Sequence, residues 1–166
     1  MNTHAQAISG QRALRKARVS LPGQIYFVTT VSSSRERFFE ITEAARAAAR
    51  IFADTRIWRE SELLAWVLMP DHAHMLLRLG DDESLCELIQ RIKSFAARAT
   101  NSVLSRSGQI WQPGYHDHAL REDEDVVSTA RYLVTNPVRA GLVTNIGEFP
   151  YWDAIWLTHG GNPLDP

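Results

Sequence analysis

The sequence is nearly without cysteine: Cys86 is the only one among its 166 residues. A single cysteine cannot form a disulfide within the chain, and it cannot supply a zinc site that is built from several cysteines. The sequence therefore excludes a disulfide scaffold and a cysteine-rich zinc domain.

Long apolar runs are also missing. No run approaches the roughly 20 residues that are needed to span a bilayer, and residues 1–18 lack the apolar segment of a signal peptide. We therefore expect a cytoplasmic protein that does not associate with membranes. The hydrophobic content of 45% and the charged content of 22% are those of an ordinary globular protein.

A strong excess of one charge is absent as well, because the net charge is −1. The first 35 residues nonetheless hold no acid and five basic side chains: Arg12, Arg15, Lys16, Arg18 and Arg35. Acids cluster instead at 81–83 and 122–125. A basic arm can contact phosphates, but a solubilising tail fits these charges equally well. We predict a basic arm over residues 1–20 and a single domain over residues 21–166.

Four segments have the composition of β-strands, which is rich in β-branched and aromatic residues or alternates in polarity. They are residues 24–31, 62–69, 72–79 and 109–120. Pro70 and Asp71 favour a turn, so the second and third segments should form a hairpin. The fourth segment is expected to be irregular, because Pro113 and Gly114 interrupt it.

Three segments have apolar residues at the helical period of 3.6 residues. We expect Thr42 to cap the first, which runs to about residue 56. A capping box at 84–87 opens the second, which ends near Asn101. The third runs from about Asp123 to Asn136, where Pro137 should stop it.

The order of these elements predicts an α+β fold. The first six match the ferredoxin-like βαββαβ pattern, an antiparallel sheet with two helices, and the seventh is an additional C-terminal helix. The two helices should cover one face of the sheet and leave the other open for chemistry or a ligand. The fold alone does not determine the function.

His72 and His74 are the first candidate site. Residues i and i+2 of a strand point to the same face, and the opposite face carries an apolar row: Ala73, Met75, Leu77 and Leu79. Both imidazoles should therefore point to the open face, where they would form part of a divalent-metal site. A His-x-His triplet taken alone more often has no such role.

Tyr132 is the second candidate. The apolar stripe of its helix consists of Val126, Val127, Ala130, Leu133 and Val134. Tyr132 lies about 160° from the centre of that stripe, and Asn136, four residues later, lies on nearly the same side. Tyr132 is therefore a surface side chain, a packing partner of another element, or a functional group.

A tyrosine suits the cutting and rejoining of DNA. A phenolate can attack a phosphodiester and keep the bond energy in a phosphotyrosine, so the strand can later be rejoined. A phenol is a weak nucleophile at neutral pH, and a divalent metal on the phosphate would neutralise the developing charge. Asn136 could complete the metal site through its amide oxygen.

Four segments together resemble the REP-associated tyrosine transposases, which belong to the single-tyrosine HUH transposases (histidine, hydrophobic residue, histidine). They are MPDHAHMLL (69–77), IKSFAARATN (92–101), GQIWQPGYHDHALR (108–121) and ARYLVTNPVRAGLV (130–143). GQIYFVTT (23–30) also fits, so the resemblance covers about residues 20–150. One departure is Asp71, where the family commonly has asparagine.

The resemblance implies roles for four residues. His72 and His74 would bind Mg²⁺ or Mn²⁺, and Asn136 would be the third ligand. Tyr132 would be the nucleophile that forms a 5′-phosphotyrosine and releases a 3′-hydroxyl. The protein would then be a metal-dependent single-stranded DNA endonuclease and strand transferase.

The resemblance also implies the partner. The substrate would be single-stranded DNA with a hairpin from a repetitive extragenic palindrome (REP) and a short guide sequence beside it. In the basic arm, Arg15, Lys16 and Arg18 are suited to such contacts. Related insertion-sequence enzymes are dimers with swapped active sites, whereas REP-associated members are thought to work as monomers, so we expect a monomer and leave a dimer open.

Several other side chains have a weaker case. Lys93 could reach a phosphate, or it could simply be solvated. Trp111 and Tyr115 could stack on bases, although packing is favoured for Trp111. The sequence leaves three further possibilities: a second histidine pair at His116 and His118, a DNA contact or helix cap from Arg139, and a packing pair of Trp152 and Trp156 on a short helix or turn.

Two other classes of function remain open. One is a domesticated protein that binds REP hairpins without cutting them. The intact set of His72, His74, Tyr132 and Asn136 argues against it, because a pure binder does not need all four. The other is a metal-binding ferredoxin-like domain unrelated to DNA, which would show no salt-dependent affinity for single strands.

Overall fold

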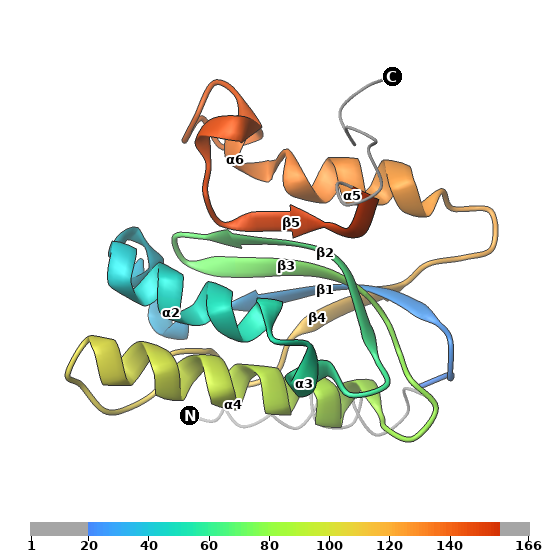
Figure 1. Cartoon of the computed structure of the whole chain (residues 1–166), viewed down its shortest axis with the longest axis horizontal. Coiled ribbons are helices and arrows are strands. Elements are labelled where there is room, and N and C mark those ends of the chain that lie inside the picture. The colour runs from blue at the N-terminus through green and yellow to red at the C-terminus, as the bar shows by residue number, and fades with distance from the viewer. Residues whose placement is uncertain (1–19, 157–166) are drawn as a thin grey trace, which may run out of the picture.

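The computed structural model describes residues 20–156 and contains one five-stranded antiparallel sheet (Figure 1). The strand order across the sheet is β4-β1-β3-β2-β5. The strands are β1 (Ile25–Val31), β2 (Glu62–Met69), β3 (His72–Arg78), β4 (His116–Ala119) and β5 (Trp152–Ala154).

The helices form layers on both sides of this sheet. The α-helices are α2 (Thr42–Ala53), α3 (Thr55–Trp58), α4 (Leu85–Val103), α5 (Val126–Val134) and α6 (Asn136–Arg139). Three 3₁₀ turns complete the described part: η1 (Ser33–Arg35), η2 (Phe38–Glu40) and η3 (Ile146–Glu148). Figure 1 shows α2 and α4 on one side of the sheet and α5 on the other. Among residues 20–156, no helix combines the length and the apolar character that crossing a bilayer requires.

The predicted ferredoxin-like arrangement is confirmed. The elements β1, α2, β2, β3, α4 and β4 follow one another as βαββαβ, apart from the short α3 and the 3₁₀ turns. The β2–β3 hairpin pairs Met69 with His72 across the predicted turn. The capping box is also present, because Ser84 and Glu87 exchange side-chain and backbone hydrogen bonds at the start of α4.

Several predicted helix boundaries were wrong. The first helix ends at Ala53, because Asp54 leaves the helical conformation and accepts a hydrogen bond from the Arg56 N–H as the cap of α3. Thr42 is the first residue of α2 and not its cap. The last helix ends at Val134, and Pro137 lies in the first turn of α6, where its missing N–H costs no hydrogen bond.

The fifth strand was missed in the sequence. Trp152 lies on β5 opposite Val67 of β2, and not on a short helix or turn. A strand of three residues is too short to show a period of two.

In the segment 109–120, only β4 is a strand, and Trp111 forms an isolated bridge to Ser32.

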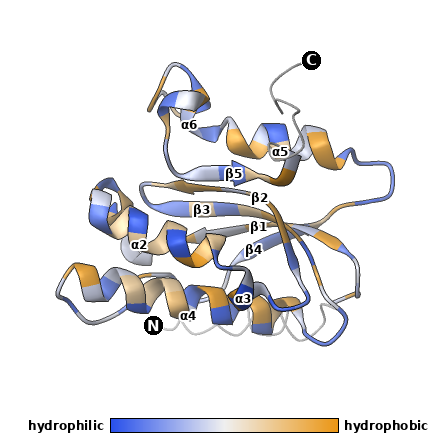
Figure 2. Cartoon of the chain, in the orientation of Figure 1, coloured by the Kyte–Doolittle hydropathy of each residue, from blue (hydrophilic) through white to orange (hydrophobic). Residues whose placement is uncertain are grey.

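The apolar face of β3 packs as predicted. The four residues of its apolar row are buried in one core with residues of α2 and α4, such as Phe52 and Ile92. The second face is not open throughout, which corrects the expectation. Ala130, Leu133 and Val134 of α5 form a second core with the β2 and β3 side chains on that face. Figure 2 shows hydrophobic segments alternating with hydrophilic ones along α4 and α5, as expected for helices with one buried side.

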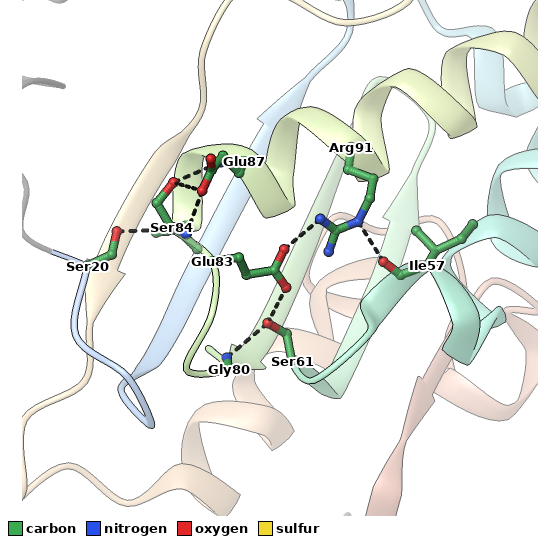
Figure 3. Close-up of polar contacts among 9 residues, drawn as sticks. Ser20, Ile57, Ser61, Gly80, Glu83, Ser84, Glu87 and Arg91 are labelled. Atoms are coloured by element: carbon green, nitrogen blue, oxygen red, sulfur yellow. Dashed lines mark hydrogen bonds and ion pairs between the residues drawn. The ribbon is translucent and has the colours of Figure 1, made fainter.

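A polar cluster ties the end of α3 to the start of α4 (Figure 3). Arg91 Nη1 lies 2.5 Å from Glu83 Oε2, and both side chains are largely buried. Ser61 Oγ donates to Glu83 Oε1 and accepts from the Gly80 N–H. A side chain at Gly80 would meet the Glu60 backbone at 2.8 Å, so this close approach requires glycine.

Candidate functional site: a histidine pair beside an exposed tyrosine

His72 and His74 lie side by side on β3. Their ring centroids are 4.8 Å apart and their planes are inclined by 75°. Ala73 between them is completely buried in the first core, so both imidazoles point to the opposite face of the sheet, as predicted. That face is the one on which α5 packs.

Each imidazole is oriented by a hydrogen bond at Nδ1. His72 Nδ1 lies 2.6 Å from Asp71 Oδ1, and His74 Nδ1 lies 2.8 Å from Thr29 Oγ1. An ionised carboxylate only accepts hydrogen bonds, so neutral His72 carries its proton on Nδ1 and has a lone pair on Nε2. Carboxylate and hydroxyl partners of this kind orient histidines that bind metals.

Asp71 is held in its ionised form. Burial raises the pKa of its carboxyl, but the hydrogen bond and charge of His72, together with the Arg35 guanidinium, outweigh burial and bring the pKa below its ordinary value. Arg35 Nη1 lies 3.4 Å from Asp71 Oδ2. The aspartate at this position therefore acts on His72 directly, which gives the departure from the family's asparagine a structural role.

His74 is held in its neutral form. Burial, the neighbouring His72 and the positive charge of Arg139 lower the pKa of His74 from 6.5 to about 3. A neutral imidazole is the form that binds a metal ion. A pair of neighbouring imidazoles therefore fits a divalent metal as part of its ligand set.

The low pKa of His74 makes the metal-free protein sensitive to acid. Between pH 6.5 and about 3 the unfolded chain binds a proton at His74 and the folded chain does not. This contribution to stability is present above pH 6.5 and is lost as the pH falls, with a slope of up to about 1.4 kcal/mol per pH unit. We expect His74→Gln to remove that slope when the free energy of unfolding is measured by urea denaturation in EDTA between pH 4 and 7.

The matched control for this pH dependence is His116→Gln, because His116 is exposed on β4. As the pH is lowered, the free energy of unfolding of the His116→Gln variant should decrease as steeply as that of the wild type. Equal slopes for the wild type and His74→Gln would contradict the neutral, buried state of His74.

Tyr132 projects from α5 away from the core. Its side chain is 60% exposed, whereas Ala130, Leu133 and Val134 are fully buried. The helix begins at Asp125, whose side chain accepts a hydrogen bond from the Val127 N–H. Burial of the predicted stripe thus fixes the helix on the sheet and leaves the phenol facing solvent.

Arg139 connects the tyrosine to the histidine pair. Its Cζ lies 3.8 Å from the centroid of the Tyr132 ring, and its Nη1 donates to the Tyr132 carbonyl at 2.6 Å and to Thr135 Oγ1 at 2.8 Å. The charge of Arg139 also acts on His74. The end of α5 and the histidines of β3 are therefore neighbours, although about 60 residues separate them in the sequence.

Asn136 is the first residue of α6, four positions after Tyr132. Its role as a metal ligand stays a prediction. Within residues 20–156 there is no group of three or more histidine, cysteine or carboxylate side chains that could hold a metal ion. Among the side chains of residues 20–156, the Asn136 amide is suited to be a further ligand.

Comparisons with known proteins identify the family. The sequence model of a family described as "Transposase IS200 like" matches residues 22–136, a range that contains both histidines and Tyr132. The chain belongs to the IS200-like transposase family. This agrees with the resemblance seen in the sequence.

Two relatives are REP-associated tyrosine transposases by name. The Haemophilus influenzae protein is 27% identical to this transposase over 139 residues, which are 78% of each chain. The Escherichia coli K12 protein is 30% identical over 95 residues, or 56% of this chain and 54% of the relative. The sequence-based assignment to this group is thereby confirmed.

A solved structure supports the fold. A REP-associated tyrosine transposase bound to a REP hairpin superposes with a TM-score of 0.64 at 22% identity, over 90% of this chain and 92% of that one. At this identity the likeness shows the shared fold.

Two of the other sequence candidates in this transposase, Lys93 and Trp111, lie outside the histidine–tyrosine site. Lys93 is not a solvated side chain, because its Nζ donates to the carbonyls of Gln112 and Gly114 at 2.7 and 2.6 Å. Its contact with DNA stays a prediction.

Trp111 packs in the core against Phe39, as favoured. Arg15, Lys16 and Arg18 lie outside the described residues.

Three contributions to the site were missed or left undecided in the sequence. Asp71 was predicted to be a turn residue that adds a charge near the metal site, but its hydrogen bond to His72 was not predicted, and Thr29 was not singled out. The strand register places Thr29 opposite His74, which only knowledge of the β1–β3 pairing could have shown. For Arg139, the expected helix cap is confirmed, and its stacking on Tyr132 is an additional contact.

Proposed function

We propose that this transposase cuts and rejoins single-stranded DNA at REP-type hairpins through a 5′-phosphotyrosine on Tyr132. The observation that carries the proposal is that α5, which holds the exposed Tyr132 ring beside Arg139, packs on the sheet face to which both oriented imidazoles point. The names of the relatives support DNA with REP hairpins as the substrate.

In this proposal His72, His74 and Asn136 hold Mg²⁺ or Mn²⁺, which would neutralise charge on the scissile phosphate when bound. Asp71 and Thr29 orient the two imidazoles through hydrogen bonds at Nδ1. Arg139 limits the movement of the Tyr132 ring, so that the phenol oxygen is kept near the phosphate.

The chemistry is a transesterification. The Tyr132 oxygen forms a bond to phosphorus, and the bond from phosphorus to the 3′ oxygen breaks. The phenol loses a proton and the leaving 3′ oxygen gains one, so protons balance. Rejoining is the reverse reaction, in which a 3′-hydroxyl attacks the phosphotyrosine and releases the phenol.

We further propose that residues 21–166 form a single domain and that residues 1–20 are a basic arm. In the arm, Arg15, Lys16 and Arg18 would contact phosphates and contribute a salt-dependent part of the affinity. The chain would work as a monomer, because α5, which carries Tyr132, packs on the sheet of its own chain.

The test uses single-stranded DNA that carries a REP hairpin and its flank from the host genome. Incubation with Mg²⁺, Mn²⁺ or EDTA should give a metal-dependent covalent protein–DNA band. A 5′-phosphotyrosine leaves the protein on the downstream fragment, so the band should carry a 3′ label and not a 5′ label. Binding without a covalent band in either metal would instead indicate a domesticated hairpin-binding protein.

Arg139→Ala tests the positioning of the nucleophile. We expect the rate of covalent-band formation to fall about ten-fold or more, because a cation–π contact and a hydrogen bond contribute about 1 kcal/mol each. Arg139→Lys should recover little of the rate, since an ammonium group lacks the planar stacking surface. The measurement is the initial rate at saturating DNA.

The matched control for Arg139 is Arg98→Ala. Arg98 makes the same kind of contact with Phe95, at 4.5 Å, on α4 on the other side of the sheet. This variant should form the covalent band at the wild-type rate. A similar loss in both variants would mean that Arg139 acts through general stability alone.

A further inference from the structure

A hollow of about 460 Å³ adjoins Tyr132 on the side of β4. Its lining comes from β1, β4, α5 and the segment before α5: Phe27, His118, Glu124, Asp125, Ser128, Thr129 and Tyr132. Phe27 and His118 are paired across β1 and β4, so together they form one wall. The other element at the hollow is α5, which carries the exposed phenol.

The hollow is also next to the histidine pair. The Phe27 ring centroid lies 5.4 Å from that of His74. Phe27 therefore contacts one of the two proposed metal-binding histidines and also lines the hollow. A nucleotide whose phosphate lay between Tyr132 and the histidines would have its base within reach of this wall.

The chemistry of the lining favours a base over a phosphate. The carboxylates of Glu124 and Asp125 lie in it, and hydrogen bonds keep them ionised: the Arg121 N–H and His118 lower the pKa of Glu124, and Ser128 and the Val127 N–H lower that of Asp125. Two negative charges repel a phosphate. An aromatic ring and an imidazole, in contrast, offer faces on which a base can stack.

The lining is rich in hydrogen-bond acceptors. Each carboxylate oxygen has two lone pairs, so Glu124 and Asp125 can accept further bonds beside those from His118 and Ser128. An exocyclic amino group of adenine, cytosine or guanine donates to such acceptors, whereas thymine has no amino group.

We propose that this hollow binds the base of a nucleotide next to the phosphate that Tyr132 attacks, and that it prefers a base with an exocyclic amino group to thymine. The position of that phosphate rests on the proposed function. The base stacks on Phe27 and His118, and the carboxylates accept from its amino group.

The test is a scan of binding affinity. Single-stranded REP oligonucleotides are made with one abasic site at each flank position in turn, and their affinity for the full chain is measured in EDTA, where cleavage is not expected. At one position the wild type should lose about ten-fold in affinity. In His118→Ala and in Phe27→Leu that loss should be much smaller, because these variants already lack a stacking surface.

The control variant is His116→Ala. His116 is exposed on the same strand as His118 and does not line the hollow. This variant should keep the full abasic penalty. Since His118 is exposed, its removal should not affect folding, so the test does not depend on Phe27→Leu alone.

The four bases are then compared at the sensitive position. Tighter binding of adenine, cytosine and guanine than of thymine supports the proposal, and a preference for thymine overturns it. It is also overturned if no flank position has a penalty that depends on His118 or Phe27. Because the scan measures binding, it tests the base site even if no covalent band forms. The absence of that band would refute the nuclease but not the base site.

Discussion

Tyr132→Phe is expected to abolish the covalent protein–DNA band completely while the protein still binds the hairpin. The phenylalanine ring keeps the contact with the Arg139 guanidinium, which lies over the ring face at 3.8 Å, and keeps the helix that carries it. Only the phenol oxygen, which forms the bond to phosphorus in the proposed mechanism, is lost. The measurement combines the labelled-DNA adduct assay with a binding titration on the same oligonucleotide.

The matched control for Tyr132 is Tyr151→Phe. Tyr151 lies just before β5, packed against the first core and next to Phe149, outside the histidine–tyrosine site. This variant should form the band at the wild-type rate. A band that persists in Tyr132→Phe would mean that Tyr132 is not the nucleophile, and the proposed mechanism would fall.

Arg91→Ala is expected to cost about 3–5 kcal/mol of folding free energy, because it leaves the Glu83 carboxylate buried without its partner. Arg91 is 14% exposed and Glu83 is 9% exposed, so water cannot replace the lost charge. Arg91 Nε also donates to the Ile57 carbonyl, which ties the end of α3 to α4. The check is the free energy of unfolding in urea at pH 7.

An exposed ion pair provides the comparison for Arg91. Arg78 and Glu62 lie 2.6 Å apart with side chains about half exposed, and Arg78→Ala should cost less than about 1 kcal/mol. The double variant Arg91→Met/Glu83→Gln should recover much of the stability, because no buried charge is left unpaired. Equal costs for Arg91→Ala and Arg78→Ala would show that burial does not govern this pair.

The sequence predicted the elements well where the local pattern is long. β2 was placed with its observed bounds, and α4 was recognised from its capping box and apolar stripe. Short elements were predicted poorly, because β5 and α6 contain too few residues to show a period. The position of β5 depends on its pairing with β2, which lies far away in the sequence. The position of α6 depends on where α5 ends, and a single capping residue decides that.

The sequence predicted which side chains the site contains and which faces they lie on. It did not predict their hydrogen-bond and stacking partners. Alternation along β3 placed His72 and His74 on one face, and the helical angle placed Tyr132 outside the core stripe, as observed. The hydrogen bond between Thr29 and His74 and the stacking of Arg139 on Tyr132 come from tertiary packing. The packing of α5 on part of the second face was missed for the same reason. The apolar stripe of α5 predicts a buried side of the helix, but not the surface against which that side packs.

The docking of α5 on its own sheet has a consequence for stoichiometry. Ala130, Leu133 and Val134 bury the helix against β2 and β3 of the same chain, so each chain carries Tyr132 on the sheet face to which its own histidine pair points. On the proposed function, a chain with one tyrosine can hold one DNA end at a time. Excision of an element with two ends would then proceed either as two successive turnovers of one molecule or as single turnovers of two molecules.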